Sequence, residues 1–270
     1  MKRSLFLAVA VCALLGGTVH AHQWFATLGD AKEYKPGDAV PLIVYSTHHF
    51  MVGEGVQDAA RNQFFVLQNN RLTDTAVTVS RNEAQKVLTG SFTLPNGAPA
   101  LVVVNSVGRF SNATPLGSKN AAKLTVKALG VNVTKTTYSE GWSKIYVNPS
   151  SQDRSFTIPL GLPLEIVPVT NPADIAAGSA AVFTVLLRGS PLANAEINAT
   201  YKGYNSADEE AWAIKGLKTD ASGQVSLPIP AGRAARDLWI VKAAYAGEVF
   251  GSPFYEAESY NSWVSFVVRK

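Results

Sequence analysis

Short apolar runs separated by turn residues recur along almost the whole chain, and this pattern limits the possible folds more than any other feature. Residues 42–45 and 101–104 are typical runs, rich in β-branched and aromatic side chains. Turn-forming pairs such as Asn96-Gly97 lie between the runs. The sequence has no long window with an apolar helical period. We therefore expect an all-β chain made of immunoglobulin-like (Ig-like) β-sandwiches.

The length of the chain fits two sandwich domains. Without its first 21 residues the chain keeps 270 − 21 = 249 residues, a length that usually makes one large or two medium domains. A proline-bounded connector at residues 168–172 follows a strand-like run and precedes a second series of runs. We expect a first domain over residues 22–168, with one of its strands at residues 123–126. We expect a second, Ig-like domain over residues 169–270.

One segment of the second domain has the composition of a tight turn. In Thr219-Asp220-Ala221-Ser222-Gly223, the aspartate can accept a hydrogen bond from the backbone two residues on, and the glycine can supply a positive φ. A calcium-binding loop would need more oxygen ligands close in sequence. We interpret this segment as a hairpin turn.

The first 21 residues have the order of a secretory signal peptide. Lys2 and Arg3 precede an apolar run at residues 5–15, and residues 19–21 fit a small-residue cleavage site. The apolar run is too short to span a bilayer. We expect cleavage after residue 21, a periplasmic location, and no membrane span in the mature chain.

The composition argues against several classes of function. Cys12, the only cysteine, lies in the predicted signal peptide, so the mature chain has no disulfide, thiolate nucleophile or cysteine metal site. The net charge of +4 is too small and too dispersed for nucleic-acid binding. The sequence contains no phosphate-binding loop, dinucleotide fingerprint, His-Glu-x-x-His motif or Gly-x-Ser-x-Gly motif. These observations favour a binding role over catalysis.

Candidate metal ligands gather at the start of the mature chain. His22, His48, His49 and Met51 are the only histidines and methionine that remain after the predicted cleavage, and Glu54 follows them closely. Imidazole is the commonest transition-metal ligand, and a thioether suits Cu(I). Histidines at the edge of a sandwich can equally be surface residues, so position alone leaves both interpretations open.

Cleavage after residue 21 would give His22 a free α-amine. This amine and the imidazole Nδ1 can chelate one metal ion, and a second imidazole then completes a histidine brace. If residues 22–28 and 40–47 pair antiparallel, His22 lies near His48 or His49. Adjacent residues on a strand point to opposite faces, so only one of these two should join His22.

Several segments resemble the DUF4198 family of periplasmic proteins, often described as NikM-like components of nickel and cobalt uptake. The best match is residues 161–168, and the opening at residues 22–25 and residues 47–50 with Glu54 also fit. The resemblance implies a periplasmic β-sandwich protein whose second half is similar to carboxypeptidase-regulatory-like modules. It also implies an inner-membrane metal transporter as a partner.

Three functions are consistent with the sequence. The leading hypothesis is a periplasmic protein that binds nickel, cobalt or copper for an uptake system. Its ligands would be His22 and His48, assisted by His49, Met51 or Glu54. The second hypothesis is a β-sandwich that binds partner proteins without a metal. The third is a histidine-brace copper oxidase, which would need exposed aromatic side chains around His22.

Overall fold

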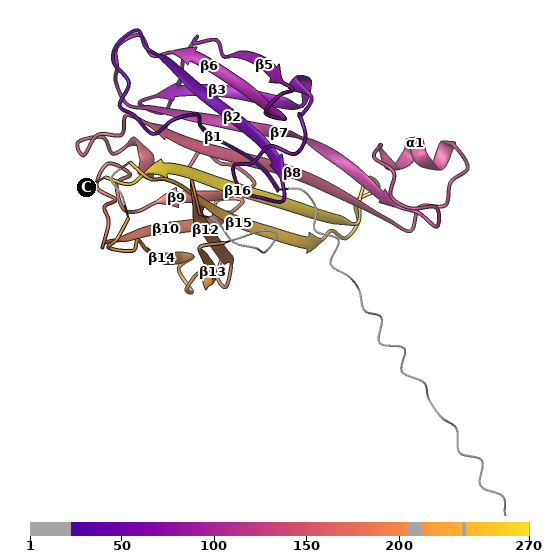
Figure 1. Cartoon of the computed structure of the whole chain (residues 1–270). Coiled ribbons are helices and arrows are strands. Elements are labelled where there is room, and N and C mark those ends of the chain that lie inside the picture. Colours follow the sequence, from indigo (N-terminus) through magenta and orange to yellow (C-terminus); the bar gives the residue numbers. More distant parts are fainter. Residues whose placement is uncertain (1–22, 205–211, 234–235, 270) are drawn as a thin grey trace, which may run out of the picture.

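The structure, a computed structural model, describes residues 23–204, 212–233 and 236–269 (Figure 1). Strands dominate these residues, which confirms the expected all-β class. The helical pieces among them are α1 (Lys123–Ala128) and two 3-10 turns, Ala59–Arg61 and Ser155–Thr157. In this part of the chain, no helix is both long and apolar enough to cross a membrane.

A four-stranded antiparallel sheet forms the outer layer of the N-terminal half, in the order β1-β2-β6-β5. Along β2, Val40, Leu42 and Val44 are fully buried, and the residues between them are more exposed. This is the two-residue period of a strand with one covered face. The strands are β1 (Gln23–Leu28), β2 (Ala39–Thr47), β6 (Val87–Thr93) and β5 (Thr78–Asn82).

A smaller sheet forms the outer layer of the C-terminal half. Its central strand is β10, which pairs antiparallel with each of the other three strands. The strands are β9 (Leu164–Pro168), β10 (Ala180–Leu187), β11 (Ser190–Pro191) and β14 (Gln224–Pro228).

An eight-stranded sheet runs through both halves, and we call it the shared sheet. Its order is β13-β12-β15-β16-β8-β7-β3-β4. The halves meet where β16 pairs parallel with β8, from Ala257 opposite Thr137 to Ser265 opposite Ile145. Figure 1 shows these long strands crossing the middle of the molecule. The strands are β13 (Ile214–Lys218), β12 (Glu196–Tyr201), β15 (Leu238–Glu248), β16 (Ala257–Val267), β8 (Lys135–Val147), β7 (Ala100–Ala113), β3 (Asn62–Gln68) and β4 (Arg71–Leu72).

The N-terminal core lies between the sheet of β1 and strands β3, β7 and β8 of the shared sheet. Burying an aliphatic side chain of this kind contributes roughly 1.5–3 kcal/mol. The core therefore holds β1 and β2 firmly against the shared sheet. Its fully buried members include Leu42, Val44, Val102, Val104 and Ile145.

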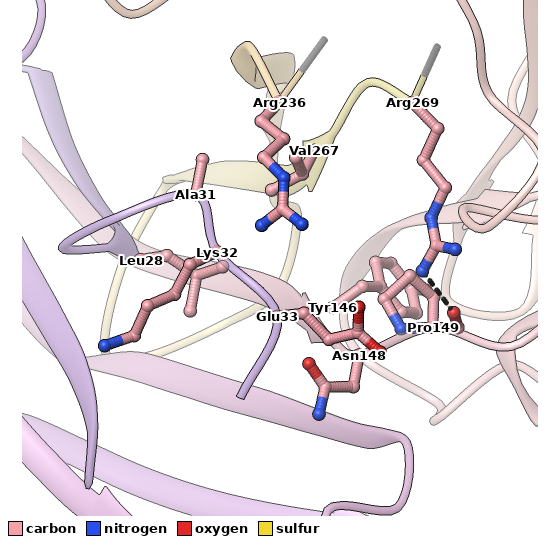
Figure 2. Close-up of a pocket in the computed structure, with 10 residues that line it drawn as sticks. All are labelled: Leu28, Ala31, Lys32, Glu33, Tyr146, Asn148, Pro149, Arg236, Val267 and Arg269. Carbon is pink, nitrogen blue, oxygen red and sulfur yellow. Dashed lines mark hydrogen bonds between the residues drawn. The ribbon is translucent and has the colours of Figure 1, made fainter. Parts of the chain in front are cut away.

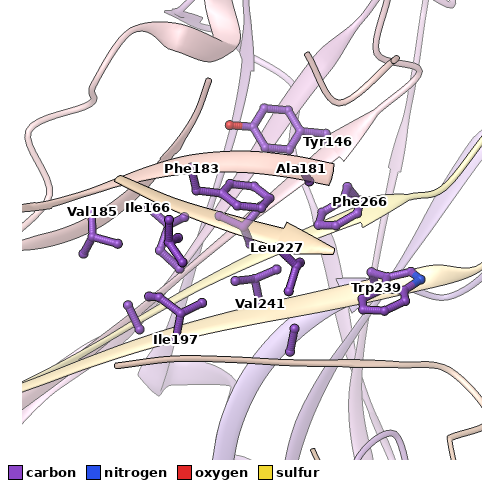
Figure 3. Packing of buried hydrophobic residues seen from close by; sticks show 14 of the residues in the cluster. Tyr146, Ile166, Ala181, Phe183, Val185, Ile197, Leu227, Trp239, Val241 and Phe266 are labelled. Carbon is purple, nitrogen blue, oxygen red and sulfur yellow. The ribbon is translucent and has the colours of Figure 1, made fainter. Parts of the chain in front are cut away.

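The C-terminal core lies between the smaller sheet and strands β12, β15 and β16 (Figure 3). Phe183 of β10 and Phe266 of β16 face each other across it, with ring centroids 5.9 Å apart. Ile166 of β9 and Val241 of β15 pack into the same core. Two layers around an apolar interior make this half an Ig-like sandwich.

The predicted boundary between residues 168 and 169 falls directly after β9. Strand β9 pairs with β10 beyond that boundary, with Pro168 opposite Phe183. The parallel pairing of β8 and β16 also unites the two sandwiches in one sheet. The count of two domains therefore stays a prediction.

The strand predicted at residues 123–126 is wrong, because these residues begin the helix α1. Lysine, leucine and alanine favour a helix. A run of four residues is also too short for its apolar period to separate helix from strand. Val126 is the buried residue of α1.

The turn predicted at residues 219–223 is confirmed. The Asp220 carboxylate accepts hydrogen bonds from the backbone N–H of Ser222 at 2.8 Å and of Gln224 at 2.9 Å. Gly223 has a φ of +74°, in the left-handed region that glycine adopts at little cost. The carboxylate therefore closes a tight turn before β14. The expected hairpin is wrong, because β13 and β14 pair in different sheets.

Candidate functional site

The start of β1 lies beside the end of β2, as the sequence predicts. The two strands pair antiparallel, with Gln23 opposite Thr47. His48 and His49 follow Thr47 directly. The loop that carries both histidines, residues 48–54, therefore leaves the sheet next to the first described residue of β1.

A carboxylate organises this loop. Glu54 Oε2 lies 2.8 Å from His48 Nδ1. Glu54 Oε1 lies 3.1 Å from both the backbone N of His49 and the hydroxyl oxygen of Thr47. The side chains of His48 and Glu54 are 22% and 24% exposed. The pair is therefore partly shielded from water but lies at the surface, where an ion in solution can reach it.

Hydrogen bonds keep Glu54 ionised. Burial raises the pKa of this carboxyl, but hydrogen bonds from His48, His49 and Thr47 outweigh burial and lower the pKa to about 2. An ionised carboxylate only accepts hydrogen bonds, so His48 Nδ1–H donates a hydrogen bond to Glu54. In a neutral imidazole with its proton on Nδ1, the lone pair lies on Nε2. Metal-binding histidines commonly show this arrangement, with the second ring nitrogen donating to a carboxylate.

Met51 and Gly53 give the loop its shape. Met51 has a φ of 59°, which is uncommon for a residue with a side chain. A Cβ added to Gly53 would lie 2.1 Å from the carbonyl oxygen of Gln85. Only glycine therefore lets the loop lie this close to the turn between β5 and β6.

The structure brings together two of the five predicted ligands, His48 and Glu54. His49 is exposed and contacts Glu54 through its backbone N–H. The Met51 side chain packs against the N-terminal core. His22 lies outside the described residues. Within the described residues, no group of three or more His, Cys, Asp or Glu side chains has an arrangement that could hold a metal ion.

Five aromatic side chains pack beside the loop, and we call them the aromatic cluster. Phe50, which follows His49, lies 4.3 Å from Trp212 and 5.7 Å from Phe25 between ring centroids. Trp263 of β16 lies 5.1 Å from Phe25 of β1. The cluster therefore ties the loop to β1 and to the shared sheet. Its members are Phe25, Tyr45, Phe50, Trp212 and Trp263.

Lys242 of β15 holds the start of β1. Its Nζ lies 2.5 Å from Gln23 Oε1 and 5.2 Å from the ring centroid of Trp263. The ammonium group thus donates a hydrogen bond and also lies near an aromatic ring. Sequence analysis missed Lys242 and Trp212 as neighbours of the loop. No local pattern could reveal them, because Trp212 contacts Phe50 and Lys242 contacts Gln23 across a long separation in the sequence.

A pocket lies at the other end of β1, away from the histidines (Figure 2). It has a volume of about 310 Å³, and its wall includes Leu28 and Lys32 from the N-terminal half. Arg236 and Arg269 approach from the C-terminal half, and Arg269 donates a hydrogen bond of 2.9 Å to the carbonyl of Pro149. The pocket and the loop at residues 48–54 are therefore separate places on the protein.

Solved structures show low similarity to this chain. The D0-D1 domain of intimin is 13% identical to this chain and has a TM-score of 0.23. The match covers 89% of this chain and 96% of the intimin chain. The D00-D0 domain of intimin is 12% identical, covers 91% of this chain and 100% of its own, and has a TM-score of 0.24. The ectodomain of mouse nectin-like molecule 4 is 12% identical, covers 92% of this chain and 65% of its own, and has a TM-score of 0.18. These TM-scores are too low to support an argument about function.

Comparison at the level of sequence families gives a clear result. No protein of curated function matches the chain. A family model described as a domain of unknown function, DUF4198, matches residues 19–247. The match covers most of the chain, including the histidine loop, the whole first sheet and most of the C-terminal sandwich. The chain belongs to the DUF4198 family.

Proposed function

We propose that this protein binds a transition-metal ion at the loop of residues 48–54, with His48 as a ligand. The observation that carries the proposal is the 2.8 Å contact between His48 Nδ1 and the Glu54 carboxylate. A histidine whose Nδ1–H donates to a carboxylate can bind a metal through Nε2, and the carboxylate makes the imidazole a stronger ligand. Glu54 then orients the ligand rather than serving as one.

His22 is the second ligand in this proposal. It directly precedes Gln23 in the sequence. Gln23 pairs with Thr47, and His48 is the next residue after Thr47. After cleavage at residue 21, the α-amine and imidazole of His22 would supply two nitrogen donors close to His48 Nε2.

The proposed donors suit a late first-row transition metal. Three nitrogen donors favour nickel, cobalt or copper, whereas calcium and magnesium prefer oxygen ligands. We propose that the protein acts in the periplasm and passes its metal to an inner-membrane transporter. The signal-like leader supports the periplasmic location in this proposal.

Isothermal titration calorimetry tests the proposal directly. The chain that begins at His22 is titrated with nickel, cobalt, copper and zinc, and a chain with one extra residue before His22 is the control. We expect tight binding that the extra residue abolishes, because it blocks the α-amine. Equal binding by both chains would move the site away from the N-terminus. No binding by either chain would refute the metal proposal.

Protein binding without a metal is the second candidate function. Strands β5 and β13 are the outer strands of their sheets and are largely exposed. Such strands can accept an added strand from a partner protein. This candidate predicts that His48→Ala changes neither the stability of the protein nor its capture of partners. A loss of metal binding in His48→Ala would favour the first candidate.

A further inference from the structure

The hairpin of β7 and β8 extends beyond the body of the protein and carries α1 at its end (Figure 1). We call residues 107–137 the arm. The turn between β15 and β16, residues 249–256, lies against it. The backbone N–H of Glu256 donates a hydrogen bond of 2.9 Å to the carbonyl of Thr136, and the Glu256 carboxylate forms an ion pair with Lys123. The arm and this turn therefore form one surface at one end of the molecule.

Buried contacts give the arm a fixed shape. Asn112 is fully buried, and its amide donates hydrogen bonds to the carbonyl oxygens of Lys119 at 3.0 Å and Ala121 at 2.6 Å. The Thr136 hydroxyl donates to Asn112 Oδ1 at 2.8 Å. These bonds join both strands of the arm to the segment before α1. The arm is therefore a preformed surface rather than a loop that must fold on binding.

Aromatic rings fix the base of the arm to the neighbouring turn. Phe110 of β7 lies 5.3 Å from Tyr138 of β8 and 6.0 Å from Tyr255 of the turn, between ring centroids. Tyr138 and Tyr255 are 5.6 Å apart. A surface made of the arm and the turn can thus act as a unit.

The arm has positively charged side chains and no negatively charged ones. The chain has no acidic residue between Glu83 and Glu140, and the arm carries five basic residues. Lys123 is paired with Glu256. Among the described residues, the other four have no ion-pair partner, and all four are exposed. These four are Arg109, Lys119, Lys127 and Lys135.

Large apolar side chains are exposed on the same surface. Of the ten exposed large apolar side chains in the described chain, six lie on the arm or the turn. Leu116, Leu129 and Phe250 are 80%, 76% and 87% exposed. Side chains in such positions gain nothing from burial within the protein, so this concentration indicates an external apolar partner. The remaining three are Val107, Leu124 and Phe254.

We propose that the arm and the turn dock the protein on an anionic lipid bilayer. Leucine and phenylalanine can enter the boundary between headgroups and acyl chains, while lysine and arginine contact the lipid phosphates. Long basic side chains reach the headgroups from an apolar surface because their stems are themselves apolar. A soluble polyanion such as a nucleic acid or an acidic polysaccharide would explain the charge but not the exposed leucines and phenylalanines.

Vesicle sedimentation tests this proposal. The chain that begins at His22 is used, because the apolar leader could insert into the bilayer by itself. Vesicles of phosphatidylcholine are compared with vesicles that also contain phosphatidylglycerol. We expect binding to the anionic vesicles that falls as salt is added. A lysine near an anionic bilayer contributes about a fivefold factor in binding, so Lys119→Gln, Lys127→Gln and Lys135→Gln together should weaken it roughly 100-fold.

Matched variants separate the arm from the rest of the surface. Lys32→Gln, Lys86→Gln and Lys215→Gln remove the same charge elsewhere and should leave vesicle binding within about twofold of the wild type. For the apolar side chains, Leu129→Ser with Phe250→Ser should weaken binding. Substitution of two exposed residues elsewhere, Leu72→Ser with Ile158→Ser, should not.

Three results would overturn the proposal. The first is equal binding to neutral and anionic vesicles, and the second is an equal loss of binding in the arm and control variants. The third is binding to soluble heparin with none to vesicles, which would replace the bilayer with a soluble polyanion. Thermal unfolding of each variant checks that it is folded. Metal titration of the arm variants should be unchanged, because the arm is separate from the loop of residues 48–54.

Discussion

Lys144 and Glu165 form an ion pair in the interior, with Lys144 Nζ 2.9 Å from Glu165 Oε1 and both side chains 1% exposed. Lys144 belongs to the shared sheet and Glu165 to the smaller sheet, so the pair links two layers. The carboxylate also accepts hydrogen bonds from the backbone N–H of Leu160 at 2.9 Å and of Gly161 at 3.1 Å. Burial lowers the pKa of Lys144, and the nearby carboxylate opposes this change. The segment that most resembles DUF4198 thus contains a charge on which the packing of two sheets depends.

Removal of one member of this pair should be costly. Lys144→Met leaves Glu165 charged and buried without its cation, and should lower the free energy of unfolding by about 3–5 kcal/mol. Adding Glu165→Gln should restore part of this loss, since it removes the unpaired charge and keeps an oxygen for the Leu160 N–H. Urea denaturation of the wild type, both single variants and the double variant measures the coupling. Simple additivity of the two single effects would contradict the prediction.

Gly53→Ala should disturb the histidine loop. The added Cβ would lie 2.1 Å from the carbonyl oxygen of Gln85, so the loop must move away from the β5–β6 turn. We expect a loss of about 1–3 kcal/mol in the free energy of unfolding, as for other overpacked sites. Gly55→Ala is the matched control, because its Cβ would meet nothing within 4 Å. Thermal unfolding measures the midpoint temperature of each variant. Equal midpoints for the two variants would show that the close approach of Gly53 has no energetic importance.

Glu54→Gln should weaken metal binding without removing a ligand. The amide cannot hold the His48 imidazole as firmly as the carboxylate does. Loss of such a supporting contact typically lowers metal affinity about 10–100-fold. Calorimetric titration measures this change, with the exposed Glu33→Gln as a control for lost negative charge. If Glu54→Gln kept the metal affinity and His48→Ala lost it, Glu54 would have no supporting role and the histidines alone would form the site.

The turn at Asp220 should lose stability in acid. Hydrogen bonds from the Ser222 side chain and the Gln224 backbone lower the pKa of Asp220 below its ordinary value of 3.8. Because the folded-state pKa is the lower one, these bonds contribute fully above pH 3.8 and are lost as the pH falls through the folded-state pKa. NMR titration of the Asp220 carboxyl carbon measures this pKa. In Asp220→Asn the local acid transition should disappear, and its persistence would assign it to another group.

Local patterns in the sequence predicted many of the strands and two local features. The placement of the start of β1 beside the end of β2, which the sequence predicts on the condition of antiparallel pairing, follows from two neighbouring apolar runs. The tight turn at Asp220 follows from a side chain that accepts a hydrogen bond from the backbone two residues on. Both predictions succeed because the interacting residues are close in sequence.

The contacts that the sequence did not predict depend on distant residues. The parallel pairing of β8 with β16 joins Thr137 to Ala257, and nothing in either strand identifies the other. The contact of Lys242 with Gln23 follows from that sheet. Helix α1 was missed for a different reason, because its apolar period is too short to be recognised. The pairing of His22 with His48 remains a prediction.

The shared sheet has a consequence for the order of assembly. Strand β16 follows all the other described strands along the chain, yet it lies next to β8 in the middle of the shared sheet. The sheet can close only after β16 emerges, and until then β8 has an exposed edge. Such late, non-local pairing makes folding slow. A chain cut after β15 would contain every strand of the N-terminal sandwich. It would still lack β16, so one edge of β8 would stay unpaired.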